Sequence, residues 1–380
     1  MKLLAVDEYI KFECIGGKCP ISCCGGNWGI TIDDESYDYY MSVEGEFGNV
    51  LRSGIIKLNG TNAFRLDEKT RDCVFLNENK LCSIYRNLGP DSLCETCRTY
   101  PRAFYDVGDI EFCYLTNSCP EVNRMIVQRI EPFNTLYDDS EEDEIIVEEG
   151  FDKPLSALMT GLDIIKNRNI KIRDRMILML IFAAKFQECM RKNTNFNDVM
   201  TAFSDLQIYK RLLDSGLAKQ ESDIAGKIRV FMIVYRSLMW DSYDHPMWKR
   251  CACLAESITH NEMPDVELIK GTYASVLNEN IQIELEQLMA YRFFVVFMQG
   301  FEAADYYDKV VYEIIMLITL ETFVILTDVF QHHKCSQNDR ILFYSLCGRI
   351  EHTVKQKESL VKELRDGGFY EQEKIIKLVS

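Results

Sequence analysis

The chain has 380 residues, of which 47% are hydrophobic and 27% charged, and its formal net charge is −16 at pH 7. This length suits two or three domains, and the apolar content excludes an intrinsically disordered protein. Residues 1–150 hold 28 acidic and 14 basic side chains, so most of the negative charge lies there. Such charge repels phosphate backbones, so no nucleic acid partner is expected, whereas a Lys-bearing protein segment would be attracted. Ordinary solubilising charge is the alternative explanation.

The N-terminal residues 1–14 lack the long apolar stretch and the small-residue cleavage site of a secretory signal. The most apolar segment, 310–326, contains Glu313 and Glu321, whose charges would be costly in lipid. We therefore expect a buried helix there, no membrane insertion and a cytoplasmic location.

Residues 1–120 are rich in Gly, Asn, Asp and Cys and contain only short apolar stretches. Alternating side chains predict strands over 28–33 and 62–67, and 73–82 is typical of two short strands around a polar turn. Further along, Gly89-Pro90 should end one short helix before a second begins. The segment is predicted to be a small irregular α+β region.

An acidic run over 138–150 is the best candidate for a domain boundary. After it, apolar spacing typical of helices, with few Gly or Pro, continues to the C-terminus. The predicted fold class is mainly α, with a small irregular Cys-rich α+β metal-binding region followed by an all-α helical domain. The predicted boundaries are 1–135 for the Cys-rich domain, 136–152 for the acidic linker and 153–380 for the helical domain.

Ten of the fifteen cysteines precede residue 120, and four of them lie in CIGGKCPISCCGG, residues 14–26. The five later cysteines lie in helical patterns and are predicted to be small core side chains. Without a secretory signal, the N-terminal density favours metal binding or redox use over disulfides. The first 244 residues contain no histidine, so a site there would be a four-thiolate zinc site or an iron–sulfur cluster. On an extended segment, Cys23 and Cys24 would point in opposite directions.

Two further motifs, CRTYPRAF over 97–104 and SCPEV over 118–122, place a guanidinium beside the presumed cluster. Arg102 would pair with a carboxylate such as Glu121, or with a carboxylate-bearing cofactor. A structural salt bridge is the simpler interpretation.

Together these motifs resemble, in order and spacing, the flagellin lysine N-methylase family and the broader cysteine-rich zinc/iron-chelating domains. The resemblance covers about the first 125 residues. The motifs that carry it are Cys14…Cys19…Cys23-Cys24, Trp28–Asp33, Cys73-x8-Cys82, Cys97-x3-Pro101-Arg102 and Cys119-Pro120-Glu121.

The resemblance implies a protein-lysine N-methyltransferase that transfers methyl groups from S-adenosylmethionine to lysine side chains of flagellin. It also implies a 4Fe–4S cluster in the Cys-rich region, with zinc as the alternative, and Arg102 and Glu121 as cofactor-binding residues. Eight thiolates are twice what one cluster needs, so two sites, or one site plus structural thiols, are both consistent with the pattern. The metal-binding cysteines carried over by position are Cys14, Cys19, Cys23, Cys24, Cys73, Cys82, Cys97 and Cys119, whereas Cys94 and Cys113 are additional to it.

The sequence has no G-x-G-x-x-G motif after a predicted strand, so S-adenosylmethionine would bind without a Rossmann-like fold. We hypothesise that a cluster iron chelates its amino and carboxylate groups, with Arg102 nearby. Asp33, Asp34 and Glu121 are candidates for deprotonating the lysine by location only, and no catalytic residue is assigned.

Three alternatives do not involve methyl transfer. The first is a non-enzymatic zinc/iron-chelating module that binds a protein partner. The second is a thiol redox protein based on Cys94-x2-Cys97, which lacks the context of a thioredoxin-like fold. The third is a set of reduced structural thiols without metal.

Overall fold

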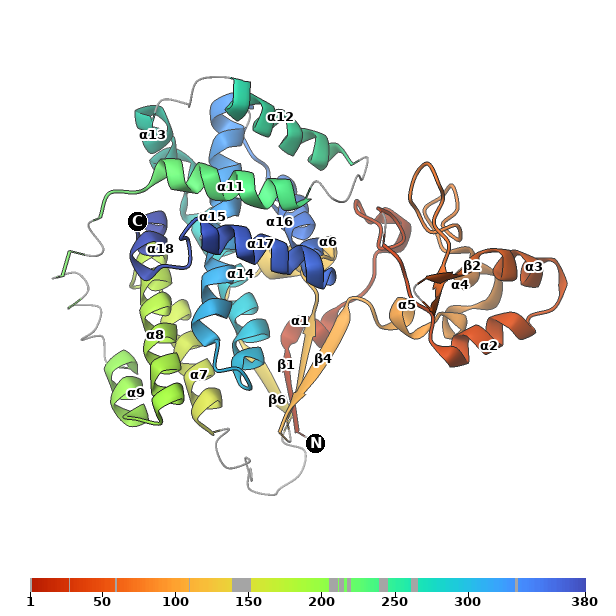
Figure 1. Cartoon of the computed structure of the whole chain (residues 1–380), viewed down its shortest axis with the longest axis horizontal. Coiled ribbons are helices and arrows are strands. Elements are labelled where there is room, and N and C mark those ends of the chain that lie inside the picture. The colour runs from red at the N-terminus through yellow and green to blue at the C-terminus, as the bar shows by residue number, and fades with distance from the viewer. Residues whose placement is uncertain are drawn as a thin grey trace.

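The computed structural model describes residues 2–26, 28–58, 60–108, 110–138, 152–204, 211, 215–216, 220–238, 245–260, 266–331 and 334–380. In these residues, a small Cys-rich lobe projects from a larger body of helices and one sheet (Figure 1). The mainly α fold class predicted from the sequence is confirmed.

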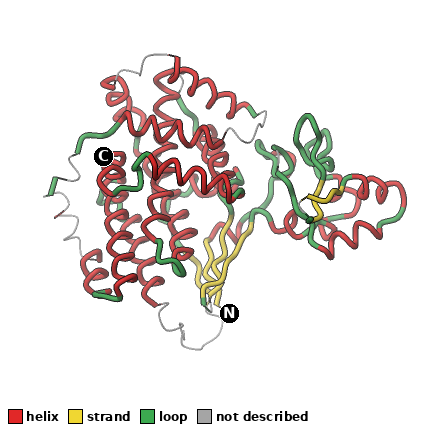
Figure 2. The backbone as a smooth tube through the Cα atoms, viewed as in Figure 1, coloured by secondary structure: helices red, strands yellow, loops and turns green. Residues whose placement is uncertain are grey.

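The body contains a four-stranded sheet with the order β4-β5-β1-β6. β1 runs parallel to β5, with Leu4 opposite Phe112, and the other neighbouring pairs are antiparallel. Figure 2 shows these strands between the helices and the lobe. The sequence predicts none of them, because each has only four to six residues and β1 pairs with strands far along the chain. The strands are β1 (Lys2–Val6), β4 (Arg102–Val107), β5 (Ile110–Leu115) and β6 (Thr135–Asp138).

The lobe consists of short elements joined by long turns. The strand predicted over 62–67 is present as β3, but 28–33 contributes only the single bridge of Thr31 to Ala63. The two strands predicted in 73–82 are reduced to isolated bridges, and Gly89 ends the first short helix as expected. The elements are α2 (Asp34–Ser42), α3 (Gly45–Ser53), β2 (Ile55–Leu58), β3 (Thr61–Phe64), α4 (Ser83–Leu88), η2 (Pro90–Ser92) and α5 (Glu95–Thr99).

The core of the lobe is small and partly made of thiols. The Tyr40 hydroxyl donates to the Ser92 carbonyl across this core at 2.7 Å. Gly54 lies directly under Phe75, where a Cβ atom would come within 2.3 Å of the ring, so no larger residue fits there. The buried residues of this core are Ile30, Ile32, Tyr40, Leu51, Phe64, Cys73, Phe75, Ile84 and Cys94.

The helices of the body surround α15, which contacts α8, α11, α13 and α14. Among the described helices, α15 alone is long and apolar enough to cross a bilayer, but its apolar stretch is entirely buried, as predicted for a core helix. The helices are α1 (Asp7–Lys11), η1 (Gly16–Lys18), α6 (Pro120–Val127), α7 (Asp152–Lys166), α8 (Ile172–Lys192), α9 (Phe196–Ser204), α11 (Ile224–Leu238), α12 (Pro246–His260), α13 (Val266–Val276), α14 (Glu279–Phe297), η4 (Met298–Gly300), α15 (Tyr306–Gln331), α16 (Gln337–Arg349), η5 (Ile350–His352), α17 (Val354–Asp366) and α18 (Gln372–Val379).

The acidic residues of α15 are accommodated by buried cations. Glu313 forms an ion pair with Arg292 of α14 at 2.8 Å, and Glu321 lies 3.7 Å from Lys227 of α11. Because a buried charge without a partner is costly, these pairs fix how α11, α14 and α15 are rotated against one another.

Residues 1–135 contribute to two separate cores. Their first and last segments, which include Leu4, Phe12 and Phe112, share the core of the helices, whereas the middle part forms the lobe. Most of the predicted linker, 139–151, lies outside the described residues. The predicted domain boundaries therefore stay a prediction.

The later cysteines follow their prediction in part. Cys189, Cys251 and Cys347 are buried in the helical body, whereas Cys335 is half-buried and Cys253 is exposed on α12. For Cys253 the prediction of a core side chain is wrong, because it lies on the face of α12 opposite the buried Cys251 and Leu254.

Candidate active site

Six thiols gather in the lobe. The backbone N–H of Cys73 donates to the carbonyl of Cys24 at 2.7 Å, which joins the first cysteine segment to the second. The Cys24 thiol interacts with those of Cys73 and Cys82, and the Cys97 thiol interacts with that of Cys94. Burial raises the pKa of Cys73 to about 11. The lobe therefore holds a compact group of thiols drawn from three separate segments, which are Cys23, Cys24, Cys73, Cys82, Cys94 and Cys97.

The adjacent cysteines do not lie on an extended segment. Residues 22–25 form a turn in which the Gly25 N–H donates to the Ser22 carbonyl at 3.2 Å. Because the turn brings the two side chains together, the expectation that they point in opposite directions is wrong. The Cys24 thiol donates to Cys23 and lowers the pKa of Cys23 to about 7, with Arg349 acting in the same direction.

Cys23 also faces a second group of thiols. Cys19 and Cys119 both interact with it, and Cys19 in turn interacts with the exposed Cys14. Burial raises the pKa of Cys19 to about 11 and that of Cys119 to about 12. Of the predicted cysteines, all but Cys14 thus interact with Cys23, and Cys14 is linked to it only through Cys19.

The two additional cysteines differ in position. Cys94 lies within the thiol group of the lobe, at the start of α5. Cys113 lies on β5, where its thiol donates to a Glu111 carboxylate oxygen at 3.1 Å and interacts with Tyr9. Cys94 is therefore a further candidate ligand, whereas the contacts of Cys113 point away from the thiol group.

The chemistry of this donor set fits a thiolate-bound metal centre. The gathered side chains are sulfur donors from a segment without histidine, and soft thiolates select zinc and iron–sulfur clusters. Within the described residues, no three Cys, His, Asp or Glu side chains already stand at ligating distance. The fit rests on the donor chemistry, and the metal and its ligand set remain proposals.

Arg102 and Glu121, the predicted cofactor-binding residues, do not pair with each other. The Arg102 guanidinium donates to the Phe12 carbonyl at 3.0 Å and lies over the Tyr9 and Phe12 rings. Glu121 instead pairs with Arg124 at 3.0 Å, because the two are three residues apart on α6. The expected ion pair between Arg102 and Glu121 is wrong, and their cofactor role stays a prediction.

The acids considered for lysine deprotonation have structural positions. Asp33 accepts hydrogen bonds from the backbone N–H groups of Ser36 and Glu95, at 2.9 and 2.8 Å, and so caps the start of α2. Asp34, the first residue of that helix, is exposed.

The C-terminal part of the chain holds the turn that carries Cys23. A guanidinium nitrogen of Arg349, at the end of α16, donates to the carbonyls of Gly25 and Gly26 at 3.3 and 2.6 Å. The same guanidinium lies over the Trp28 ring, 4.4 Å from its centroid. A residue more than 300 positions away therefore fixes both the cysteine turn and the tryptophan beside it.

Three rings meet where the lobe joins the body. The Trp28 centroid lies 4.8 Å from that of His352 and 5.4 Å from that of Tyr100. The Ser118 hydroxyl links two of them, because it lies 2.7 Å from His352 Nε2 and 3.1 Å from the Tyr100 hydroxyl. Since Ser118 directly precedes Cys119, this junction borders the thiol site.

A buried ion network fixes residues that neighbour this junction. The guanidinium of Arg292, which is 1% exposed, binds Glu313 and Glu351 and contacts the Asn117 amide oxygen at 3.3 Å. Burial opposes ionisation of Glu351, but Arg292 and Lys357 lower its pKa. A carboxylate is thereby fixed next to His352.

The sequence interpretation missed Tyr100, Arg349 and His352 as site residues. Tyr100 had a signal, since it lies inside the CRTYPRAF motif. Arg349 and His352 lie in the helical region without any motif, so only folding shows that they reach the site.

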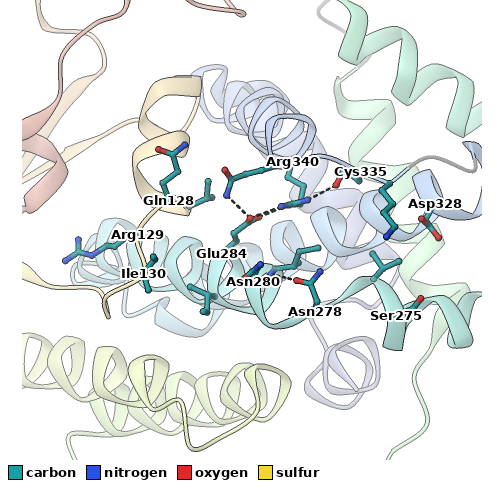
Figure 3. Close-up of a pocket in the computed structure, with 16 residues that line it drawn as sticks. Gln128, Arg129, Ile130, Ser275, Asn278, Asn280, Glu284, Asp328, Cys335 and Arg340 are labelled. Atoms are coloured by element: carbon teal, nitrogen blue, oxygen red, sulfur yellow. Dashed lines mark hydrogen bonds and ion pairs between the residues drawn. The ribbon is translucent and has the colours of Figure 1, made fainter.

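A separate cavity of about 700 Å³ lies where α6, α13, α14, α15 and α16 end or begin (Figure 3). Glu284 lies in the wall of this cavity, where it forms an ion pair with Arg340 at 2.6 Å and accepts a hydrogen bond from Gln337 at 2.9 Å. The charged groups at its centre are thus paired, and none of the cysteines before residue 120 lines it.

Comparison with known proteins places the chain in a family. Residues 160–378 match the model of the FliB lysine N-methylase C-terminal domain. Over 135 residues, 33% of this chain, it is 31% identical to the flagellar biosynthetic protein FliU of Salmonella muenchen and covers 79% of that protein.

Over 135 residues the chain is also 30% and 31% identical to proteins named lysine-N-methylase from Salmonella typhimurium and Salmonella choleraesuis. These matches span 33% of this chain and about a third of the length of each relative. No solved structure is significantly similar to the chain. Because the family model covers more than half of its residues, the chain belongs to the FliB lysine N-methylase family.

Proposed function

We propose that the chain is a protein-lysine N-methyltransferase that transfers a methyl group from S-adenosylmethionine to lysine side chains of flagellin in the cytoplasm. The family supports lysine methylation, and one relative is named a flagellar biosynthetic protein. The observation that carries the proposal is the junction at which the thiol group, two aromatic rings and a histidine meet.

The reaction needs a neutral lysine amine. Its nitrogen lone pair attacks the methyl carbon of the sulfonium, the carbon–sulfur bond breaks, and S-adenosylhomocysteine leaves. The protein must therefore remove a proton from the lysine, hold the amine in line with the methyl group, and keep competing water away.

The thiol site would hold a 4Fe–4S cluster, or zinc in its place. Cys23, Cys24, Cys73, Cys82, Cys94 and Cys97 are its candidate ligands in the lobe, with Cys14, Cys19 and Cys119 beside them. Such a centre, when bound, supplies a Lewis acid that can chelate the amino and carboxylate groups of S-adenosylmethionine. Arg349 holds the adjacent turn through its hydrogen bond to the Gly26 carbonyl, and its positive charge favours the thiolate form of Cys23.

The acidic N-terminal part suits a substrate that presents lysine. Residues 1–150 hold twice as many acidic as basic side chains, so they attract a cationic segment over a distance of about 10 Å at 0.1 M ionic strength.

Mass spectrometry of flagellin incubated with S-adenosylmethionine and anaerobically purified protein tests the proposal. We expect a mass increase by whole methyl groups on lysine, together with iron and sulfide in the protein and a visible cluster spectrum. No mass increase with a fully metal-loaded protein would favour the non-enzymatic chelating module that binds a protein partner. Zinc in place of iron in an active preparation would contradict the 4Fe–4S assignment alone.

A further inference from the structure

We propose that His352 accepts the proton of the target lysine and that the Trp28 and Tyr100 rings hold the cationic end of its side chain. This inference rests on the proposed lysine methylation and assigns the residues that would carry out its proton transfer.

The position of His352 is set by both bodies of the molecule. It is exposed and follows directly after Glu351 in η5. Its Nε2 lies 2.7 Å from the Ser118 hydroxyl, one residue before Cys119, and its ring lies 4.8 Å from Trp28 of the lobe. A lysine that reaches this imidazole would thus stand at the edge of the thiol site.

The His352 ring can donate or accept in its contact with Ser118, and the tautomer with the proton on Nε2 leaves a lone pair on Nδ1. If Nε2–H donates to Ser118, the Ser118 hydroxyl can donate onward to Tyr100 at 3.1 Å or to Thr116 at 3.0 Å. The lone pair of His352 then lies on Nδ1, where it can accept a proton from an ammonium group.

The charged groups around His352 favour a neutral ring that can become charged. Partial burial lowers its pKa, Glu351 raises it, and Arg349 and Arg292 lower it. Ser118 and Tyr100 contribute only hydroxyls. The ring is therefore neutral before the reaction, and the Glu351 carboxylate stabilises the imidazolium that forms.

Other titratable groups at the junction are less suited to accept the proton. Burial and the neighbouring Cys119 raise the pKa of the Tyr100 hydroxyl well above its usual value, so it stays protonated. Glu121 is engaged by Arg124, and Glu351 by Arg292. Among the groups described at the junction, His352 is exposed and has a lone pair that no ion pair engages.

The aromatic rings provide recognition of a cation. Trp28 already binds the Arg349 guanidinium through its ring at 4.4 Å, which shows that its environment suits cation–π contact. The Tyr100 ring packs edge to face against the Trp28 ring, at an interplanar angle of 78°. Cation–π contacts contribute about 0.5–2 kcal/mol each and suit methylated ammonium groups.

The helix that follows His352, α17, carries a groove on its surface. A surface groove of about 590 Å³ begins at Glu351 and Val354 and runs along the helix to Asp366. It is lined by alternating acidic and basic side chains, and Val354 is 71% exposed. Glu351, which lines one end of this groove, is the residue before His352.

The proton and electron balance of the step is complete. The lysine ammonium gives its proton to Nδ1 of His352, and its nitrogen lone pair then forms the new bond to the methyl carbon. The carbon–sulfur bond electrons return to sulfur, and S-adenosylhomocysteine leaves as a neutral thioether. The imidazolium releases its proton to solvent.

The test compares His352→Gln with His260→Gln, which changes an exposed histidine at the end of α12. We expect kcat of the first variant to fall about 100-fold near neutral pH. The rate should recover as the pH approaches about 10, where lysine loses its proton without help. Iron content should be unchanged in both variants. A wild-type rate and pH profile in His352→Gln would overturn the proton-transfer role.

A binding measurement tests the aromatic part without turnover. Calorimetry with a flagellin peptide carrying Nε-trimethyllysine should show about tenfold weaker binding for Trp28→Leu. Trp28→Phe should restore part of it, and Phe104→Leu, at a 62% exposed ring on β4, should bind like the wild type. Equal affinity of Trp28→Leu and wild type would overturn this part. Wild-type protein that binds the peptide through Trp28 but transfers no methyl group would refute the proposed function and the proton transfer while leaving the aromatic site intact.

Discussion

The Cys-rich lobe and the helical body are stabilised in different ways. The lobe buries nine side chains in its own core, two of them cysteines, and its two-stranded sheet and short helices leave many turns. The body buries a continuous apolar core shared by the sheet and the long helices. A core as small as that of the lobe does not offset the conformational entropy of its loops, so crosslinking by metal is expected to supply the rest. The stability of the lobe is therefore expected to depend on the proposed metal site more than that of the helical body does.

Removing a central thiol should have the largest effect. In Cys23→Ser or Cys97→Ser we expect loss of bound iron and of S-adenosylmethionine binding, because the first 244 residues offer no histidine that could replace the lost ligand. Iron and sulfide analysis and calorimetry measure both. Cys253→Ser, at an exposed position of α12, is the control and should keep both. Cofactor binding by an iron-free variant would refute iron chelation of S-adenosylmethionine.

Removing the metal should affect the lobe and the helical body differently. After anaerobic chelation we expect faster amide hydrogen exchange in the lobe elements α2 to α5, because their core alone is insufficient. Exchange in α14 and α15 should not change, since these helices are buried on all sides. Equal protection of the lobe with and without metal would show that its apolar core suffices.

Breaking a buried ion network should destabilise the helical body, with a smaller effect than the loss of a thiol or of the metal. Arg292→Met leaves the carboxylates of Glu313 and Glu351 without their cation, and such losses cost about 3–5 kcal/mol in unfolding free energy. Arg236→Met removes an exposed ion pair to Glu363 and should cost less than about 1 kcal/mol. Denaturant unfolding distinguishes the two. Similar costs for both variants would mean that the buried network adds no stability beyond a surface pair.

The smallest predicted effect is a pH dependence of the body. Burial lowers the pKa of Lys227 from 10.5 to about 8. Between pH 8 and pH 10.5 Lys227 is protonated in the unfolded chain but neutral in the folded one. The free energy of unfolding should therefore rise with pH in this range, by roughly 3 kcal/mol at most.

Below pH 8 both states are protonated and this contribution does not change. In Lys227→Met this rise of the unfolding free energy with pH should be absent. The difference between the pH–stability curves of wild type and variant measures it. Parallel curves for variant and wild type would contradict the lowered pKa.

Much of the local structure followed from local signals. Gly89 ends its helix, and the apolar pattern of 310–326 forms a buried helix. The turn at Cys23-Cys24 was misjudged, because turn geometry in a Gly-rich segment depends on the carbonyl contacts that Arg349 makes from far along the chain.

The amino-acid sequence by itself determined that the fold is mainly helical, that the N-terminal part is acidic and that most of the cysteines lie there. These properties reside in composition, periodicity and spacing. Only the tertiary structure decided that β1 pairs with β5, that Cys94 joins the thiols while Cys113 does not, and that His352 reaches Trp28 and Ser118. The physical reason is that contacts between residues far apart in sequence depend on how whole elements pack, which no local pattern records.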